Sequence, residues 1–457
     1  MEILKDLDKS VFRGYDIRGV ADEVLTPDFA YTIGKSFGSY IRKFNKDTCL
    51  VGHDNRISSD KLYKSLIEGL CSTGVNVISL GLVTTPMYYY ACIKYNNPTG
   101  IMVTASHNPK EDNGFKMAID SSGNIKGKEI EDFYNFTIES NFIDGKGSIT
   151  EVDIKPDYLK LFKENLSFGD RRLKVVIDPG NGTTSVIAKE LYSMFPIDLI
   201  AINDISDGTF PNHHPDPCVE DNLKQLKEKV KETGADIGLG FDGDGDRVGV
   251  ISNLGNFIPI DMYMIIIIRD IIDKVENKTF LYDVKCSKAV EDEIEKLGGT
   301  GVCCRTGNSY TKAKVKELDL PFGGEYSGHV YFRDRWLGFD SGLYAGLRLL
   351  EILSKTDKSV EELLTGVEKY YSTDELKFPS SDDKKFKVVE RIGKYAKEKE
   401  YKYLDIDGVK VLFDDGFALV RASNTGPNIT ARFEARSKDR LEKLQKEFVS
   451  LIEEYNK

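Results

Sequence analysis

Residues 50–54 read Leu-Val-Gly-His-Asp, a short β-rich run that ends in an aspartate. The same pattern returns as Val-Val-Ile-Asp at residues 175–178 and as Phe-Leu-Tyr-Asp at residues 280–283. A polar turn, a helical pattern and a second apolar strand follow each run; the predicted helices cover residues 59–70, 183–191 and 287–297, and the second strands cover residues 75–78, 197–200 and 301–304. Strand–helix–strand units of this kind predict α/β domains in which helices cover mixed or largely parallel sheets.

The composition and the pattern of predicted elements change after Glu368. Residues 382–400 are rich in lysine and glutamate at helical spacing, and three β-rich runs precede a last helical pattern, at residues 409–413, 418–421 and 429–434. We therefore expect three related α/β domains and a smaller C-terminal α+β domain. A prior of roughly 150 residues per domain allows three or four domains in 457 residues. The predicted domains are residues 1–154, 155–256, 257–368 and 369–457.

The charge balance argues against a nucleic-acid partner. The chain has 63 lysines and arginines against 74 aspartates and glutamates, which gives a formal net charge of −11, and the excess acid is spread along the sequence. Such a surface does not attract a polyanion, so positive charge for an anionic substrate must be placed locally.

Targeting and membrane signals are not expected from the sequence. The N-terminus lacks a basic stretch followed by an apolar one, so we expect no signal peptide. The longest apolar run lies at residues 264–268 between Asp261 and Arg269, far short of the roughly 20 residues of a membrane span, and it predicts a buried helix. Seven cysteines without Cys-x-x-Cys spacing predict reduced, buried thiols in a cytoplasmic protein, with neither disulfides nor zinc.

A serine follows a predicted strand at residues 100–105. Ser106 opens the polar segment Ser-His-Asn-Pro, and a loop at a strand end holds a nucleophile rigidly while leaving its oxygen open. Residues 113–116, Asn-Gly-Phe-Lys, predict a turn that returns Lys116 toward the serine. Taken alone, the segment is equally consistent with an ordinary turn that contains a capping serine.

An aspartate loop follows another predicted strand at residues 235–241. Asp242, Asp244 and Asp246 alternate with glycines that let the backbone curl round a cation. A calcium EF-hand needs glycine at its sixth position and glutamate at its twelfth, where this chain has Arg247 and Asn253. Three carboxylates suit Mg²⁺, which commonly completes its shell with phosphate oxygens, and the loop therefore predicts a phosphoryl site.

Two further loops have the groups needed to bind a sugar phosphate. Residues 324–329, Gly-Glu-Tyr-Ser-Gly-His, combine a carboxylate, a hydroxyl and an imidazole, and His329 is a candidate for proton transfer. Residues 421–428, Arg-Ala-Ser-Asn-Thr-Gly-Pro-Asn, offer a guanidinium fork, hydroxyls and backbone amides, as a phosphate nest does. Near the N-terminus, Tyr15 and Arg18 are additional candidate anion contacts.

These four loops, in this order, resemble those of the α-D-phosphohexomutase superfamily, most closely its bacterial phosphomannomutase/phosphoglucomutase group. The likeness covers essentially the whole chain and includes residues 85–87 and 209–217. It implies three related α/β domains and a C-terminal lid domain round a central cleft. It also implies an isomerase that interconverts hexose 1-phosphate and hexose 6-phosphate.

The resemblance assigns roles to particular residues. It implies that Ser106 is a phosphoserine that binds Mg²⁺ with Asp242, Asp244 and Asp246, and that Arg247 and Lys116 flank the transferring phosphoryl group. Glu325 and Ser327 would bind the sugar hydroxyls at C3 and C4. The other substrate contacts that it implies are Tyr15, Arg18, Lys285, Asn308, Arg421, Ser423, Asn424 and Thr425, and Trp336 also aligns with cleft positions.

The implied reaction passes through hexose 1,6-bisphosphate, with glucose 1,6-bisphosphate as activator and Mg²⁺ as cofactor. Contacts at C3 and C4 are blind to C2, so both glucose and mannose phosphates are expected substrates. One departure concerns residues 306–308, which read Thr-Gly-Asn where many dual-specificity relatives have Thr-Gly-His. Asn308 cannot carry a proton, which puts the balance between the two sugars in doubt.

Other functions stay open at this point. Phosphoglucosamine mutases typically have glutamine in the middle of the sugar loop, where this chain has Tyr326. A sugar-phosphate-binding protein without catalysis would not need Ser106 and the three aspartates, and a simple phosphatase would need no bisphosphate activator. The sequence leaves the oligomeric state, monomer or dimer, undecided.

Overall fold

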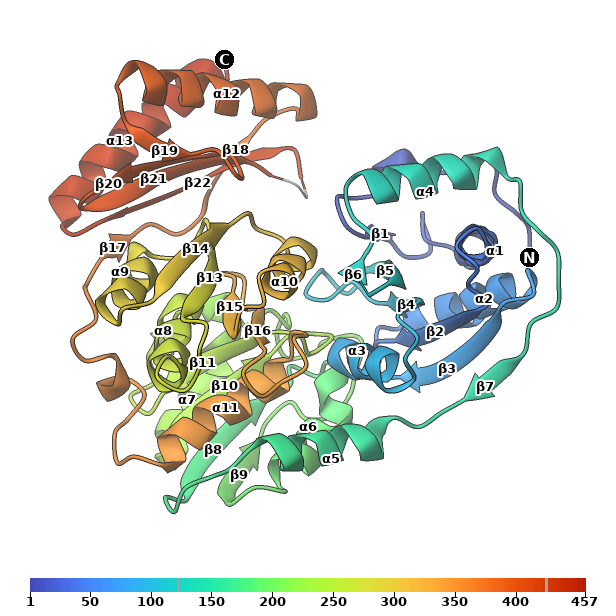
Figure 1. The fold of residues 1–457 in the computed structure, drawn as a ribbon, viewed down its shortest axis with the longest axis horizontal. Helices are drawn as coiled ribbons and strands as arrows, with labels where there is room; N and C mark the ends of the chain where they lie inside the picture. The colour runs from blue at the N-terminus through green and yellow to red at the C-terminus, as the bar shows by residue number, and fades with distance from the viewer. Residues whose placement is uncertain (122, 424–425) are drawn as a thin grey trace. The chain divides into compact units, whose positions relative to one another are not determined.

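The computed structural model describes residues 1–121, 123–423 and 426–457, without the side chain of Asp382. The chain divides into two compact units, whose helices and strands are labelled in Figure 1. The first unit comprises residues 1–260 and 327–363, and the second comprises residues 261–326 and 364–457. Within the described residues, every helix is too short or too polar to span a bilayer.

The first sheet of the first unit is mixed. Its strands lie in the order β1 (Ile17–Val20), β5 (Asp112–Asp120), β4 (Gly100–Val103), β2 (Thr48–His53), β3 (Asn76–Leu82) and β7 (Ile149–Glu151), with β6 (Gly123–Asn124) beside β5. From β4 to β7 the neighbours are parallel, whereas β5 is antiparallel to both β4 and β1. The helices of this part are η1 (Lys9–Val11), α1 (Pro27–Arg42), α2 (Ser59–Cys71), α3 (Thr85–Lys94) and α4 (Lys128–Glu139).

Helix α1 supplies much of the core that this sheet buries. Thr26 caps it by accepting a hydrogen bond from the Phe29 amide, and a proline occupies the first turn, where its missing N–H costs nothing. Its apolar stripe packs with strand residues such as Val51 and Ile101. Helices α1 and α2 cross closely, because a Cβ atom on Gly69 would lie 2.8 Å from the Lys35 nitrogen.

The second sheet also belongs to the first unit. Its order is β12 (Phe257–Ile258), β11 (Val248–Ser252), β10 (Ile237–Phe241), β8 (Leu173–Asp178) and β9 (Ile197–Ala201). The pairs β10–β8 and β8–β9 are parallel, and the others are antiparallel. The same unit contains α5 (Lys155–Asn165), η2 (Thr183–Val186), α6 (Ala188–Tyr192), η3 (Glu220–Leu223), α7 (Lys224–Thr233), β16 (Val330–Phe332), α11 (Gly342–Ser354) and η4 (Glu362–Leu364).

Helices α7 and α11 cover opposite faces of the second sheet. A Cβ atom on Gly238 would touch Val230 and Leu226 of α7, whereas the next residue, Leu239, reaches Gly346 of α11. Because successive strand residues point to opposite faces, the sheet lies between the two helices, and both of its faces are buried. Burial on both faces explains why β10 and β11 read as continuous apolar runs without polar alternation.

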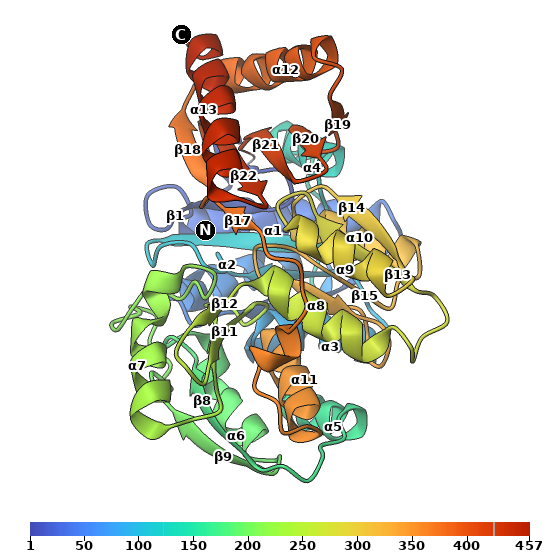
Figure 2. The same cartoon turned by 90° about the vertical axis from the view of Figure 1, so that its left-hand side faces the viewer.

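The second unit contains two sheets. Parallel strands β14 (Thr300–Cys304), β13 (Thr279–Asp283) and β15 (Phe322–Gly324) accompany α8 (Ile260–Ile271), α9 (Lys288–Lys296) and α10 (Asn308–Glu317). An antiparallel sheet follows in the order β17 (Tyr371–Ser372), β22 (Asn428–Ala435), β21 (Gly416–Ala422), β20 (Val409–Phe413) and β19 (Lys402–Leu404), with β18 (Leu376–Pro379) beside β22. Helices α12 (Asp382–Glu398) and α13 (Lys438–Tyr455) pack together over this sheet (Figure 2).

The predicted fold class is confirmed, and so are the three repeated units. Strands β2, β8 and β13 each lead through a helical segment to a parallel neighbour. The single helix predicted at residues 183–191 is wrong, because Ile187 has φ −139° and separates η2 from α6. The predicted strand at residues 100–105 ends at Val103. The turn predicted at residues 113–116 is also wrong, since these residues lie inside β5.

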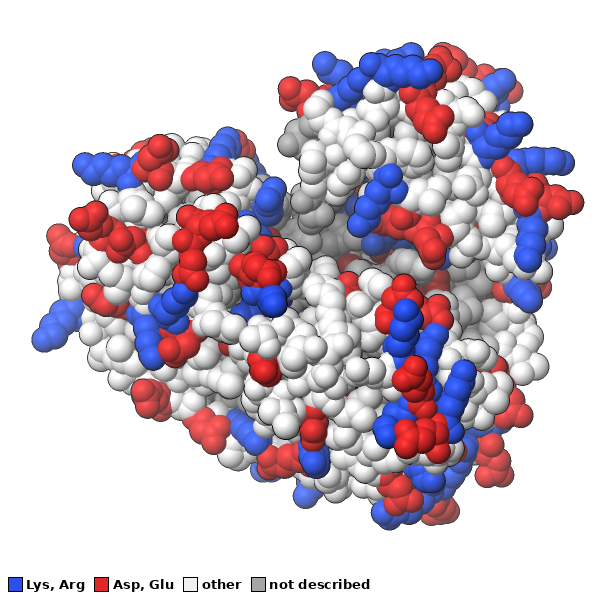
Figure 3. Space-filling model, turned by 180° about the vertical axis from the view of Figure 1, so that it is seen from behind, with Lys and Arg blue, Asp and Glu red and all other residues white. Residues whose placement is uncertain are grey.

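The expectation that the thiols are buried holds for only three of the seven cysteines. All seven cysteines are free thiols, but four of them are only partly buried, because they lie near strand ends, helix ends and loops and not in the sheet centres. On the face shown in Figure 3, basic and acidic side chains are interspersed, and neither sign forms a continuous field.

Candidate active site

The candidate site lies at the carboxyl ends of parallel strands in the first unit. Strands β2 and β4 pair in register, with His53 opposite Val103, so the segments that follow them meet at one edge of the sheet. These segments are residues 54–56 and 104–106. In the second sheet Asp178 lies opposite Gly240, so the segment after β8 meets the aspartate loop after β10 in the same way.

Ser106 is held in an unusual conformation. Its φ is 52°, in the left-handed region, which costs a non-glycine residue about 1–3 kcal/mol and persists only where the surroundings impose it. The Ser106 amide donates to Thr104 Oγ1 at 2.9 Å, and Ser106 Oγ donates to Asp242 Oδ2 at 3.0 Å. The hydroxyl is therefore oriented by the loop that bears the three aspartates.

His107 lies beside the serine. Its Nδ1 is 3.3 Å from Ser106 Oγ. Burial, and then the positive charges of Arg247 and Arg18, hold the pKa of His107 well below its usual range, so this ring is neutral at neutral pH.

The aspartate loop curls back on its own carboxylates. Asp242 Oδ1 accepts hydrogen bonds from the amides of Gly245, at 3.0 Å, and Arg247, at 3.1 Å. Gly245 has φ 83°, a conformation that favours glycine. Thr85, at the start of α3, fixes Asp244 by donating its hydroxyl at 2.6 Å to the carboxylate and its amide at 2.9 Å to the carbonyl.

Two buried cations face these carboxylates. Lys116 Nζ donates to Asp244 Oδ2 at 2.8 Å and to Asp246 Oδ2 at 2.9 Å. Burial lowers the pKa of Lys116, but the charges of Asp244 and Asp246 outweigh it and raise the pKa well above its usual value. Burial also lowers the pKa of Arg247, and nearby carboxylates, Asp242 first, raise it overall. Both residues thus stay cationic.

The donor set fits a divalent cation. Ligand atoms of Asp242, Asp244 and Asp246 lie within 4.8 Å of one another, and all three side chains are fully buried. Asp244 Oδ1 and Asp246 Oδ1 accept no hydrogen bond from any residue that the structure describes. Burial and the neighbouring charges of Asp246 and Asp244 raise the pKa of Asp242 well above its usual value. Such crowded carboxylates are typical of a Mg²⁺ site.

His329 connects Arg247 to Asp340. Arg247 Nε donates to His329 Nε2 at 3.0 Å, and His329 Nδ1 lies 2.8 Å from Asp340 Oδ2. Because a guanidinium only donates and a carboxylate only accepts, this arrangement requires the neutral His329 tautomer that has its proton on Nδ1. The ring therefore orients Arg247, and the proton transfer predicted for His329 stays a prediction.

The Arg18 side chain, which comes from β1, contacts the Ser106 loop, and its predicted role as an anion contact stays a prediction. Its Nη1 donates to Asn108 Oδ1 at 2.7 Å and to the Ala105 carbonyl at 3.2 Å, and its Nε donates to Asp16 at 2.7 Å. Tyr15 is half-buried next to that pair. The Ser327 carbonyl accepts a hydrogen bond from Cys218 Sγ.

Trp336 lies in a buried aromatic cluster of the first unit. Its ring stacks on Tyr344 with centroids 3.9 Å apart and also contacts Phe162 and Phe339. This packing gives Trp336 a place in the core, which the resemblance did not indicate.

Other candidate substrate contacts lie in the second unit. Glu325 is buried, and Asn308 is the first residue of α10. Arg421 Nη2 forms an ion pair of 2.8 Å with Asp407, and Lys285 Nζ lies 3.7 Å from Glu375.

The loop after β21 is only partly described. The Ser423 carbonyl accepts a hydrogen bond of 2.8 Å from Lys385 Nζ. Asn424 and Thr425 lie outside the described residues, so their predicted role as phosphate contacts is not addressed by the structure.

Sequence reasoning missed three residues of this site. Asp340 follows no recognisable pattern, and only its contact with His329 shows its place. Thr85 belongs to the stretch 85–87 that supported the resemblance, but nothing in it indicated a contact with Asp244. Arg56 follows the first aspartate-ending strand, and the shared edge of β2 and β4 was the available signal for it.

Four domain families match consecutive parts of the chain. They are phosphoglucomutase/phosphomannomutase alpha/beta/alpha domain I at residues 9–142, domain II at residues 156–255, domain III at residues 259–370, and the phosphoglucomutase/phosphomannomutase C-terminal domain at residues 375–451. Together they cover most of the sequence in the order of the family.

Similar proteins match over nearly their full length. The phosphomannomutase/phosphoglucomutase of Pseudomonas syringae pv. tomato is 41% identical over 96% of this chain and 94% of its own length. The phosphoglucomutase of Neisseria meningitidis serogroup A is 36% identical over 98% of both chains. A crystal structure of a phosphoglucomutase/phosphomannomutase family protein from Burkholderia thailandensis superposes with a TM-score of 0.92, at 36% identity over 98% of both chains. The chain belongs to the phosphoglucomutase/phosphomannomutase family.

Proposed function

We propose that this hexose-phosphate mutase, an isomerase by its family, transfers a phosphoryl group through Ser106 with Mg²⁺ held by Asp242, Asp244 and Asp246. Mannose and glucose phosphates are the proposed substrates, and glucose 1,6-bisphosphate is the proposed activator. The single observation that supports this most strongly is the 3.0 Å hydrogen bond between Ser106 Oγ and Asp242 Oδ2. It joins a conformationally held serine to the three carboxylates proposed to bind the cation.

Charge compensation supports a phosphoryl group at this position. The three buried carboxylates outnumber the two cationic side chains, Lys116 and Arg247, so a bound cation would offset the excess negative charge. A phosphoserine brings about −1.5 to −2 charge, which those carboxylates would repel without a divalent ion. Bound Mg²⁺ would neutralise charge that develops on the phosphoryl oxygens in the transition state.

The proposed reaction consists of two phosphoryl transfers. In the first, a hydroxyl oxygen of the hexose monophosphate forms a bond to phosphorus, the bond from phosphorus to Ser106 Oγ breaks, and the hydroxyl proton ends on Ser106 Oγ. The resulting hexose 1,6-bisphosphate turns end for end. In the second transfer Ser106 Oγ forms a bond to the other phosphorus, the bond from that phosphorus to the sugar oxygen breaks, and the serine proton ends on that sugar oxygen. Atoms and charge balance over the cycle.

The chain's own groups have distinct parts in these steps. Lys116 and Arg247 stay protonated and hold the oxygens of the transferring group. His329 keeps Arg247 in place, because its Nε2 accepts from the guanidinium. His329 is hydrogen-bonded to both Arg247 and Asp340. We therefore propose that its main role is to orient Arg247, and that proton transfer is a secondary role.

Sugar and phosphate recognition are proposed for the remaining residues. Glu325 and Ser327 would bind the hydroxyls at C3 and C4, and Arg421, Ser423, Asn424 and Thr425 would hold the phosphate that is not transferred. Further substrate contacts would come from Tyr15, Arg18, Lys285 and Asn308. A C-terminal domain that closes over the substrate would exclude water and protect the phosphoserine from hydrolysis.

A steady-state assay tests the proposal. Conversion of glucose 1-phosphate and of mannose 1-phosphate to the 6-phosphates is measured with and without Mg²⁺ and glucose 1,6-bisphosphate. Activity is expected on both sugars, with dependence on both additions. Release of inorganic phosphate without an activator would indicate a phosphatase, and inactivity on both substrates would direct the search to an amino-sugar phosphate.

A further inference from the structure

The turn after β2, residues 54–56, contacts both the Ser106 loop and the segment behind the aspartate loop. We propose that Arg56 and Asn55 are positioning residues that hold the nucleophile loop and the metal loop at a set spacing. This inference rests on the proposed function, because it takes Ser106 as the phosphorylated nucleophile. Neither residue is expected to touch substrate, so each acts through the backbone that it holds.

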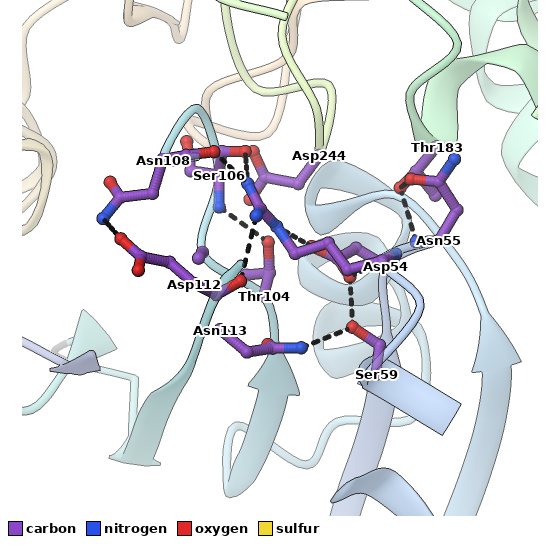
Figure 4. A network of polar contacts seen from close by, with 12 residues as sticks. Asp54, Asn55, Ser59, Thr104, Ser106, Asn108, Asp112, Asn113, Thr183 and Asp244 are labelled. Carbon is purple, nitrogen blue, oxygen red and sulfur yellow. Dashed lines mark hydrogen bonds and ion pairs between the residues drawn. The ribbon is translucent and has the colours of Figure 1, made fainter. Parts of the chain in front are cut away.

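Arg56 binds the Ser106 loop through four carbonyl oxygens. Nη1 donates to the carbonyls of Pro109, at 2.6 Å, and Asp112, at 2.9 Å. Nη2 donates to the carbonyls of Ser106, at 2.8 Å, and Asn108, at 2.7 Å. The Arg56 side chain is buried, and Figure 4 shows Ser106, Asn108 and Asp112, three of the residues whose carbonyls it binds, close to one another. A planar guanidinium with donors on both nitrogens matches this ring of carbonyls, and an ammonium does not.

The hydrogen bonds of Arg56 include one to Ser106, the residue of the loop that has the left-handed backbone conformation. A serine in the left-handed region persists only if neighbouring groups fix its two peptide units. Thr104 binds the amide of Ser106, and Arg56 binds its carbonyl. Both sides of the nucleophile are thus tied, and the side chain is aimed at Asp242.

Asp54 holds the guanidinium from the other side. Its Oδ2 lies 3.3 Å from Arg56 Nε, and its Oδ1 accepts from the Arg56 amide at 3.1 Å and from the Ser59 hydroxyl. The ring of Phe210 covers the guanidinium with 5.4 Å between the Arg56 Cζ and the ring centroid. Arg56 is therefore anchored independently of the loop that it holds.

Asn55 makes the second connection. Its amide donates to Thr183 Oγ1 at 3.0 Å, and its side chain donates to the Asn181 carbonyl at 2.7 Å. The Thr183 amide in turn donates to the Gly243 carbonyl at 2.8 Å, inside the aspartate loop. Figure 4 shows Asn55 and Thr183 paired on one side of the turn, with Ser106 and Asp244 on the other side of the network.

The loops themselves also approach closely. A Cβ atom on Gly243 would lie 2.6 Å from the Ser106 carbonyl oxygen, so the aspartate loop runs directly over the serine. A shift of the Ser106 carbonyl would move the serine relative to the carboxylates. Phosphoryl transfer is sensitive to such shifts, since a displacement of about 1 Å can cost on the order of a hundredfold in rate.

Arg56→Lys tests the inference on the full-length enzyme. The phosphorylation rate of Ser106 by glucose 1,6-bisphosphate is measured in a single turnover, by mass spectrometry of the quenched protein. The expected result is a loss of at least about tenfold in this rate, with the KM for glucose 1-phosphate within about twofold of the parent. Arg171→Lys is the matched control, because Arg171 also binds two backbone carbonyls and a carboxylate, and these partners (Thr356, Lys358 and Asp236) belong to neither the Ser106 loop nor the aspartate loop.

The outcomes separate positioning from simple stabilisation. If Arg56→Lys slows the transfer by less than about threefold, or only as much as Arg171→Lys does, the inference is overturned. Should Arg56→Lys fail to fold, Asn55→Ala decides, because it leaves the carbonyl network intact; an unchanged transfer rate in that variant overturns the inference. Failure of the proposed function looks different, since the parent enzyme itself would then carry no phosphate on Ser106.

Discussion

Ser106 Oγ and Asp242 Oδ2 lie 3.0 Å apart, although 136 residues separate them in the sequence. Each follows the end of a buried strand, Ser106 after β4 and Asp242 after β10. The hydroxyl has a carboxylate as acceptor, so its position is set by the loop proposed to hold the metal. The proposed nucleophile and the proposed cation site thus contact each other directly, and a change in either is expected to affect both.

Asp244→Asn is expected to weaken Mg²⁺ binding. The change removes one negative charge from a buried oxygen pair whose Oδ1 has no described hydrogen-bond donor. We expect Mg²⁺ affinity, measured by isothermal titration calorimetry, to fall at least about tenfold, with a larger loss of kcat/KM. Asp236→Asn is the control, because Asp236 pairs with Arg171 away from the loop. Unchanged affinity in Asp244→Asn would place the metal elsewhere.

Asp340→Asn is expected to act on kcat. The Asp340 carboxylate fixes the Nδ1–H tautomer of His329, and Nε2 of that ring orients Arg247. An amide accepts this hydrogen bond less strongly, so we expect kcat to fall about tenfold to a hundredfold while KM stays within about twofold. A raised KM with unchanged kcat would show instead that His329 serves ground-state binding of the sugar.

His213 is expected to make stability depend on pH. Its Nε2 lies 3.0 Å from Asp178 Oδ2 and its Nδ1 lies 3.0 Å from the His214 carbonyl, so only the imidazolium satisfies both acceptors. Burial lowers the pKa of His213, but the hydrogen bond to Asp178 and its charge raise it overall. The stabilisation is therefore complete below the unfolded pKa of about 6.5 and is lost as the pH rises through the folded pKa.

Urea unfolding of His213→Gln tests whether the stabilisation by His213 is lost as the pH rises. The variant is expected to lose more unfolding free energy, relative to the parent, at about pH 5.5 than at about pH 8.5. Asp178→Asn should remove the difference, because the carboxylate that raises the pKa is gone. A larger loss at the higher pH would contradict the assignment of a charged imidazole.

The enzyme is expected to discriminate little between glucose 1-phosphate and mannose 1-phosphate. The proposed recognition at C3 and C4 does not involve C2, so kcat/KM for glucose 1-phosphate and mannose 1-phosphate should agree within about tenfold, or ~1.4 kcal/mol. Asn308→His tests the one departure from the family pattern, at the first residue of α10. If Asn308 does not read C2, the variant keeps the same ratio of the two kcat/KM values. A ratio that changes more than about tenfold would identify Asn308 as a specificity residue.

The candidate site residues could be identified in the sequence because they follow predicted strands. Ser106, Asp242, Asp244 and Asp246 follow apolar runs, and the glycines between the aspartates indicated a curled loop. The three repeated units were predictable for the same reason, because each begins with a buried strand that has an aspartate at its end: Asp178 and Asp283 are the last residues of β8 and β13, and Asp54 directly follows β2. The exact domain boundaries stay a prediction.

Contacts made through the backbone were not predictable. Arg56 binds carbonyl oxygens of residues 50 to 56 positions away, and carbonyls leave no mark in a sequence.

Two elements differ from the prediction. Lys116 reaches the site because β5 pairs with β4, where the sequence suggested a turn. The helix at residues 183–191 failed because β-branched residues at 183, 184, 186 and 187 disfavour a continuous helix, an effect that propensity indicates only weakly.

Phosphate transfer to and from Ser106 can be followed directly. The protein is mixed with labelled glucose 1,6-bisphosphate, quenched on the millisecond scale and digested, and the labelled peptide is identified; glucose 1-phosphate is then added to the phosphorylated enzyme. We expect label on Ser106, its transfer to the sugar at a rate at least equal to kcat, and no label in Ser106→Ala. Label on another residue, or a transfer slower than kcat, would contradict the phosphoserine mechanism.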